Sequence, residues 1–185
     1  MSIKNINDDL QIIYLENILN INDKNKYILL NLNVKYDIRK SLYNKYSIVC
    51  ELDNVSKQKL KDIEKAVIDY IINNTIRLYN RVLTKDEIIN SYKNKIINEN
   101  NIRVNLPLIK GDFNTSFFDV NKKQKVITPL NIGEYINRGS NISIHIEPAL
   151  WINKKNLFGI SLKAKSIKIN YSSNTNNTYN CIFDE

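Results

Sequence analysis

Three lysines lie close together near the end of the chain, at positions that share one face of a predicted strand. Lys163 and Lys165 are two residues apart, and Lys168 follows after a change of phase. Trp151 and His145, in the preceding strand, are candidate neighbours on the same face. Lysine ammonium groups attract phosphates, and flat rings offer unstacked bases a surface on which to stack. This combination on a pleated surface suits a single-stranded nucleic acid.

The predicted strand over residues 158–171 changes its hydrophobic phase once. Apolar residues occupy alternate positions up to Ala164, and the alternation resumes one position out of step at Ile167. A slip of one residue exchanges the two faces of a strand, so we expect a β-bulge near Lys165–Ser166. The bulge would keep Lys168 on the face that carries the other two lysines.

A second candidate surface surrounds a predicted turn at residues 121–123. Phe117 and Phe118 precede this turn, and adjacent residues of a strand point to opposite faces, so one ring is expected to face outward. Lysines interleaved with aromatic rings can hold phosphates while bases stack. The candidate nucleic-acid-binding residues are Lys163, Lys165, Lys168, Trp151, Lys154, Lys155, Arg138, His145, Phe117, Lys122 and Lys123.

Each of these features has a structural alternative, and these alternatives stay open at the level of the sequence. A lone tryptophan is usually largely buried, so Trp151 can be a core residue instead of a stacking surface. The two phenylalanines can both pack beneath a loop. The lysines can form an ordinary solvated surface, because Ile, Asn, Lys and Tyr, all abundant here, have AT-rich codons.

Residues that would support catalysis are scarce. His145 is the only histidine, and the chain has no GxSxG, HExxH or glycine-rich phosphate-binding motif. Cys50 and Cys181 are far apart and belong to no CxxC or Cys/His cluster, so neither a zinc site nor a disulfide framework is expected. A metal-dependent nuclease needs several converging carboxylates, and residues 103–171 hold only 4 acidic side chains. We therefore expect no enzymatic activity, no metal and no cofactor.

The positive charge is concentrated in the second half of the chain. Residues 103–171 hold 11 Lys and Arg against 4 Asp and Glu, whereas residues 1–102 hold 16 against 13. This distribution favours a nucleic acid or an anionic membrane as the partner. The sequence has no apolar run long enough for a membrane span and begins without the apolar segment of a signal peptide, so we expect an intracellular location and no membrane partner.

The elements that would position these side chains are mostly strands. Runs of alternating or β-branched apolar residues predict strands at residues 27–35, 46–52 and 102–109. An ambiguous apolar stretch at 10–21 is interpreted as a further strand, and residues 138–171 predict a long hairpin.

Between these strands the hydrophobic period changes to that of a helix. Ser56 is expected to cap a helix that runs to about Asn73. Thr84 and Glu87 form the pattern of a capping box, and the helix that they begin is expected to continue to about Asn98. The two helices would form a pair inserted between strands.

This pattern predicts a mainly β, α+β fold, an OB-like antiparallel β-barrel with an inserted or appended helical pair. Closing a small sheet into a barrel removes its exposed edges, and the number of strands fits a five-stranded OB barrel. We expect a single domain over residues 1–171, with the helical insertion at about 56–99. Residues 172–185 are polar and of low complexity, and are expected to form a flexible tail with an acidic end.

The segment from Gly139 to Ile169 resembles the corresponding part of single-stranded-DNA-binding proteins from phages and large DNA viruses. The residues that carry the resemblance are Gly139-Ser140, Leu150-Trp151, Lys154-Lys155, Phe158-Gly159-Ile160 and the strand from Leu162 to Ile169. The resemblance implies an OB-fold sheet in which this hairpin contacts the DNA strand. It also implies that the acidic, aromatic end of the chain, with Phe183, Asp184 and Glu185, recruits replication proteins.

We therefore expect a sequence-nonspecific single-stranded DNA-binding protein that acts in viral DNA replication or recombination. Its location would be the host cell, in a cytoplasmic viral factory or in the nucleus. RNA as the ligand and a homo-oligomeric state stay open. The alternatives are a structural or scaffold protein of a virion, whose lysines are merely solvated, and a small nuclease.

Overall fold

The computed structural model describes residues 3–7, 10–14, 27–40 and 45–171, so Phe183, Asp184 and Glu185 lie outside the described residues. The chain divides into two compact units. The barrel unit comprises Tyr27–Asp53, Ile96–Glu147 and Lys163–Glu185. The helical unit comprises Met1–Lys26, Asn54–Lys95 and Pro148–Leu162.

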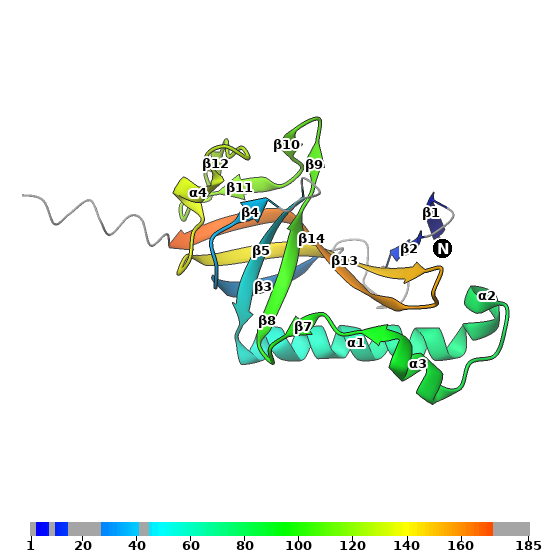
Figure 1. The fold of residues 1–185 in the computed structure, drawn as a ribbon. Helices are drawn as coiled ribbons and strands as arrows, with labels where there is room; N and C mark the ends of the chain where they lie inside the picture. The colour runs from blue at the N-terminus through cyan, green and yellow to red at the C-terminus, as the bar shows by residue number, and fades with distance from the viewer. Residues whose placement is uncertain (1–2, 8–9, 15–26, 41–44, 172–185) are drawn as a thin grey trace, which may run out of the picture. The chain divides into compact units, whose positions relative to one another are not determined.

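The barrel unit is built around five strands that form a closed ring (Figure 1). They are β3 (Ile28–Val34), β5 (Tyr46–Leu52), β8 (Asn101–Leu106), and the parts of β13 (Asn141–Asn153) and β14 (Phe158–Tyr171) that belong to this unit. The order is β13–β3–β5–β8–β14, and β14 pairs with β13 to close the ring. The first three of these pairings are antiparallel, and β8 pairs with β14 in parallel. This closed five-stranded ring is OB-like and confirms the predicted fold class.

The barrel core follows from the alternation of apolar residues along these strands. In β3, Leu30, Leu32 and Val34 are buried, whereas Leu29, Asn31 and Asn33 are exposed. The other strands contribute Ile48, Cys50, Leu52, Ile102, Val104, Leu106, Ile142, Ile144, Ile146, Ala164 and Ile167. Each fully buried aliphatic side chain stabilises the fold by about 1.5–3 kcal/mol. Burial also raises the pKa of the Cys50 thiol, which keeps it neutral.

Short elements complete the barrel unit. They are β4 (Arg39–Lys40), β7 (Ile96–Ile97), β9 (Leu108–Ile109), β10 (Asp112–Phe113), β11 (Ser116–Phe118), β12 (Gln124–Lys125) and α4 (Ile132–Tyr135). Pro107 separates β8 from β9 because it has no N–H to donate to a strand ladder. Lys110 and Gly111 both have positive φ angles, 53° and 94°, in the turn between β9 and β10. β11 pairs in parallel with β14 and extends the sheet beyond the barrel.

The helical unit combines three helices with short strands. Its elements are β1 (Ile3–Asn7), β2 (Leu10–Tyr14), α1 (Asn54–Asn73), α2 (Thr75–Tyr79), α3 (Lys85–Ser91), β6 (Tyr92–Lys93) and the remaining parts of β13 and β14. β13 pairs with β3 up to Ile146 and with β2 from Ala149. Pro148, which lacks an N–H, lies where the partner changes. Within the described ranges, no helix is both long and apolar enough to cross a lipid bilayer.

Helix α1 buries one stripe of side chains. Leu60, Ile63, Val67 and Ile71 recur at spacings of three and four residues and are buried. At the start of α3, the Glu87 backbone N–H donates to Thr84 Oγ1 at 3.3 Å, and the Thr84 N–H donates to Glu87 Oε2 at 2.8 Å. The Thr84 N–H and the Thr84 hydroxyl, which both donate to Glu87 Oε2, lower the pKa of the Glu87 carboxyl. The reciprocal bonds between Thr84 and Glu87 confirm the predicted capping box.

Two predicted helix boundaries are wrong. Helix α1 begins at Asn54, so Ser56 is a buried residue of its first turn and not its cap. Helix α3 ends at Ser91 and does not continue to Asn98, because Tyr92 adopts an extended conformation and pairs with Phe158. The rings of Tyr92 and Phe158 lie 5.4 Å apart, so a contact distant in sequence outweighs the local helical pattern.

Candidate nucleic-acid interface

A groove of about 480 Å³ crosses the outer face of the barrel unit, and we call it the basic groove. It is lined by Leu29, Phe118, Lys122, Ser143, His145, Ser166 and Lys168. These residues come from β3, β11, β13, β14 and the turn after β11. Residues from distant parts of the sequence therefore meet on one surface.

Strand pairing places the residues of the basic groove side by side. His145 in β13 lies opposite Leu29 in β3, and Phe118 in β11 lies opposite Lys168 in β14. The His145 Nδ1 and Ser166 Oγ atoms are 2.9 Å apart, which joins β13 and β14 across the groove. The sheet therefore holds an aromatic ring and a lysine in fixed register.

The change of phase in β14 sets the direction of Lys168. Ala164 and Ile167 are buried, and the two residues between them, Lys165 and Ser166, are both partly exposed. Two successive partly exposed residues shift the alternation by one position, as predicted for a bulge. Because of this shift, Lys168 lines the groove while Ile167 remains in the core.

Lys122 is presented by a turn that Asp119 stabilises. Asp119 Oδ1 accepts the Lys123 backbone N–H at 2.9 Å, and Asp119 Oδ2 forms an ion pair with Lys125 Nζ at 3.3 Å. The Lys123 amide, and then Lys125, lower the pKa of the Asp119 carboxyl. Lys122 itself has a φ of 63°, a left-handed conformation at the tip of the turn.

The lysines near the groove differ in the charge that they offer to an anion. Lys165 is paired with Glu147 at 3.3 Å, and Lys125 is paired with Asp119. Lys122 and Lys168 form no ion pair within the described part of the chain. These two lysines are therefore the cations of the groove that can take a phosphate without giving up an existing partner.

A wall of hydrogen-bonded amides and hydroxyls lies beside the groove, and we call it the amide wall. Asn170 Nδ2 donates to Asn141 Oδ1 at 2.9 Å and to Ser143 Oγ at 2.8 Å. Asn141 Nδ2 donates to Asn33 Oδ1, and Ser143 Oγ donates to Asn31 Oδ1, both at 2.8 Å. The wall is polar and uncharged, and its bonds link β3, β13 and β14.

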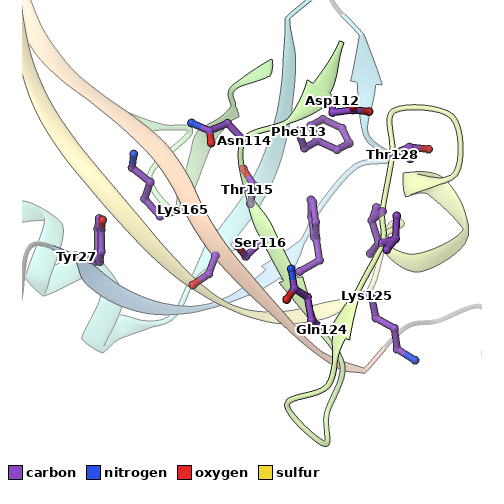
Figure 2. Close-up of a pocket in the computed structure, with 14 residues that line it drawn as sticks. Tyr27, Asp112, Phe113, Asn114, Thr115, Ser116, Gln124, Lys125, Thr128 and Lys165 are labelled. Carbon is purple, nitrogen blue, oxygen red and sulfur yellow. The ribbon is translucent and has the colours of Figure 1, made fainter. Parts of the chain in front are cut away.

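A second pocket of about 610 Å³ adjoins the groove at Ser166, which lines both (Figure 2). We call it the neutral pocket, because both of its lysines are ion-paired and its other polar side chains, apart from the exposed Asp112, carry no charge. Phe113 contributes a half-buried ring, whose centroid lies 5.3 Å from that of Tyr46 and 5.7 Å from that of Phe117. Figure 2 shows Asp112, Asn114, Ser116 and Gln124 among the side chains that line this pocket, together with Lys125 and Lys165.

The prediction that Phe117 stacks on bases is wrong. Its side chain is only 2% exposed, and it lies opposite the buried Ile167 of β14. Phe118 points to the other face of β11 and lines the basic groove. Which of two adjacent phenylalanines faces outward depends on the pairing of β11 with β14.

The remaining predicted residues lie in several places. Lys163 is partly exposed in the barrel unit, opposite Asn105, and Lys123 is exposed beside Lys122. Arg138 is exposed on a turn that its backbone N–H anchors to Asp37 Oδ1 at 2.9 Å. The structure does not place these three among the residues that line the groove.

Trp151, Lys154 and Lys155 belong to the helical unit. The Trp151 ring is partly exposed and lies over Gly159, where an added Cβ would be 2.9 Å from Trp151 Cζ2. Lys154 and Lys155 are exposed in the turn between β13 and β14, and the Lys155 N–H donates to Asn153 Oδ1 at 3.0 Å.

Four groove residues are not among the predicted site residues: Leu29, Phe118, Ser143 and Ser166. The exposure of Leu29 could have been found from the sequence, because Leu29 is an apolar residue on the face of β3 that also carries Asn31 and Asn33. Among the described residues, no three His, Cys, Asp or Glu side chains lie together as ligands for a metal ion.

The fold and groove define an OB-like barrel with a cationic, aromatic-lined surface. No protein-family model matches the sequence, and no curated protein matches it. A solved structure of the single-stranded DNA-binding protein from bacteriophage Enc34 is similar, with a TM-score of 0.49, 14% identity, and coverage of 93% of this chain and 91% of that one. Its C-terminal truncation gives a TM-score of 0.48, 14% identity and coverage of 92% of both chains.

A third similar structure is gp2.5, a single-stranded DNA-binding protein encoded by bacteriophage T7. Its TM-score is 0.45 and its identity 10%, with 85% of this chain and 96% of that chain covered. These structures are of phage single-stranded DNA-binding proteins, the class that the sequence from Gly139 to Ile169 resembles.

Proposed function

We propose that the barrel unit binds single-stranded DNA without reading its sequence, and that the protein acts by binding alone, without catalysing a reaction. The observation that carries this proposal is the composition of the basic groove. Phe118, Lys122 and Lys168 line one concave surface, and neither lysine has an acidic partner in the described part of the chain.

The groove combines the two interactions that a single strand requires. Lys122 and Lys168 neutralise phosphates and release counterions, which makes the affinity dependent on salt. Phe118 gives an unstacked base a surface, and every base has a π-face, so stacking tolerates any sequence. In a duplex the bases are already stacked and paired, so the ring gains a partner only when the strand is single.

The biological role that we propose is viral DNA replication or recombination inside the host cell. This role rests on the resemblance of residues 139–169 to the single-stranded-DNA-binding proteins of phages and large DNA viruses. The 2′-hydroxyl distinguishes RNA from DNA, and none of the groove interactions involves that group, so the choice of DNA in this proposal rests on the resemblance alone.

The test is a titration of a fluorescently labelled oligothymidylate, followed by anisotropy at several salt concentrations. The wild-type protein should bind the single strand more tightly than a duplex of equal length. The double variant Lys122→Ala/Lys168→Ala should reduce the slope of log K against log salt by about 0.7 for each phosphate that is no longer neutralised, or about 1.4 in total.

The matched control is Lys61→Ala/Lys65→Ala, which removes the same charge from exposed positions of α1 in the helical unit. This control should leave the slope unchanged. Absence of binding at low salt would favour the scaffold alternative, and metal-dependent cleavage of the oligonucleotide would reveal a nuclease. An oligouridylate in place of the thymidylate compares RNA with DNA.

A further inference from the structure

The neutral pocket differs from the basic groove because its cations already form ion pairs within the protein, and some of its hydroxyls already form hydrogen bonds. Its two cations both have partners, since Lys165 is paired with Glu147 and Lys125 with Asp119. Two of its hydroxyls are also occupied. Thr115 Oγ1 donates to the Ala164 carbonyl oxygen at 3.0 Å, and Thr128 Oγ1 donates to Asn131 Oδ1 at 3.2 Å.

The uncommitted groups of the pocket are neutral except for Asp112, an exposed carboxylate of its lining. Asn114, Ser116 and Gln124 are exposed, and their side chains make no hydrogen bond within the described ranges of the chain. Tyr27 adds a hydroxyl at the rim, and its side chain is exposed. Two amides and two hydroxyls supply both donors and acceptors, which is what the edge of a neutral polar ring requires.

The walls of the pocket suit a flat ligand. Phe117 and Ile127 are buried and form part of its lining, and the Phe113 ring is held in place by its contacts with Tyr46 and Phe117. An aromatic face favours another ring in offset or edge-on contact. The volume of about 610 Å³ lies within the range of roughly 300–1,000 Å³ that small-ligand sites occupy.

The pocket and the groove meet on β14. Ser166 lines both, and Lys168 lies two residues further along the same strand, about 6.6 Å away at the usual rise per residue. Ser116 lies opposite Ser166, and Phe118 lies opposite Lys168, so β11 continues the same arrangement. A nucleotide can therefore place its base in the pocket while its phosphate lies at the groove.

We propose that the neutral pocket is a base-binding subsite, which takes one unstacked nucleobase of the strand whose phosphates lie in the basic groove. This proposal rests on the proposed function and adds that the phosphates and the base are bound by different sets of residues. Lys122 and Lys168 hold the phosphates, whereas Asn114 and Gln124 form hydrogen bonds with the base edge. Each amide offers both donors and an acceptor, so these bonds can form with any base and do not read the sequence. The ligand class of the pocket is a nucleobase within a single strand.

The experiment compares an oligothymidylate with an abasic oligomer of the same length, which keeps the phosphates and lacks the bases. Affinities are measured for the wild-type protein, for Asn114→Ala/Gln124→Ala and for Lys122→Ala/Lys168→Ala. The matched control is Asn73→Ala/Asn90→Ala, which removes two exposed amides from helices α1 and α3 of the helical unit.

Asn114→Ala/Gln124→Ala should weaken binding of the thymidylate by about two- to twelvefold for each hydrogen bond removed, and leave binding of the abasic oligomer and the salt slope unchanged. Lys122→Ala/Lys168→Ala should weaken both ligands alike, and the control should change neither. An amide variant that weakens both ligands equally, or neither, overturns the subsite while the proposed function stands. A wild-type protein that binds neither oligomer at low salt overturns both.

Discussion

Lys165 Nζ lies 3.3 Å from Glu147 Oε2, and this ion pair distinguishes Lys165 from Lys168 on the same strand. Both partners are partly shielded, with 31% of the Lys165 side chain and 18% of the Glu147 side chain exposed. The pair is held where the basic groove adjoins the neutral pocket. Glu147 therefore reduces the positive charge that the barrel offers to a phosphate at this point.

Replacing Glu147 by Gln should increase the affinity for single-stranded DNA. The substitution releases the Lys165 ammonium, and one further phosphate contact would raise the salt slope by about 0.7. The gain should be largest at low salt, where charges are screened least. The control Glu134→Gln removes the same charge from an exposed position of α4. Equal gains in both variants would show that net charge acts, and not the release of Lys165.

Phe118→Ala and Phe117→Ala should affect different properties, the first DNA binding and the second the stability of the fold. Phe118 lines the groove, so its removal should weaken DNA binding by about 1–3 kcal/mol and leave the thermal unfolding curve nearly unchanged. Phe117 is fully buried, so its removal should reduce the free energy of unfolding by about 3–5 kcal/mol. Anisotropy titrations and circular-dichroism melts of both variants measure these effects. A Phe118→Ala variant that binds like the wild type contradicts the stacking role.

Gly159→Ala should destabilise the helical unit. The added Cβ would lie 2.9 Å from Trp151 Cζ2 and 2.9 Å from the Lys93 carbonyl oxygen, so both the indole and the Lys93 backbone must shift. Overpacking of this kind costs about 1–3 kcal/mol, and tryptophan fluorescence should report the displacement during a denaturant titration. In Gly133→Ala the added Cβ meets no atom within 4 Å, so this variant serves as the control and should unfold like the wild type. Equal stability of Gly159→Ala and Gly133→Ala would show that the surroundings of Gly159 adjust without loss of stability, and would contradict the prediction.

Asp119 should titrate below the ordinary aspartate value of 3.8, because the Lys123 amide and then Lys125 favour its ionised form. With the pKa lowered in the folded state, the ionised carboxylate stabilises the turn above pH 3.8, and this stabilisation disappears as the pH falls through the lowered value. An NMR titration of the Lys123 amide should show its midpoint below 3.8, and Asp119→Asn should abolish the transition. A midpoint at or above 3.8 would contradict the prediction.

The barrel strands could be predicted because the alternation of core and surface residues that specifies each strand lies within the sequence of that strand. Residues 46–52 alternate between core and surface, and the structure has β5 at the same residues. The change of phase near Lys165–Ser166 was also visible, since it is a local property of the sequence, and the structure buries Ala164 and Ile167 on either side of it. Helix α1 follows from the stripe that ends with Val67 and Ile71, whereas its first residue, Asn54, lies before the first apolar residue of that stripe.

The basic groove could be predicted only in part, because it depends on pairings between distant strands. Lys168 and Lys122 follow from charge and turn patterns. The parallel pairing that sets Phe118 beside Lys168 has no signature in either segment, so adjacent phenylalanines could not be distinguished. The end of α3 was missed for the same reason, since Tyr92 takes its conformation from Phe158.

The composition of the amide wall determines how easily mutation can change the charge beside the basic groove. Asn31, Asn33, Asn141 and Asn170 face outward beside the lysines of the groove. Asparagine and lysine codons share their first two bases. One substitution at the third base therefore replaces any of these four asparagines by lysine, and its amide by an ammonium group. Each such change gives up one or two neutral hydrogen bonds and adds a cation next to the groove. The added cation raises the salt slope by about 0.7 for a new phosphate contact. The wall is therefore a set of positions at which the strength of DNA binding can be adjusted one nucleotide at a time.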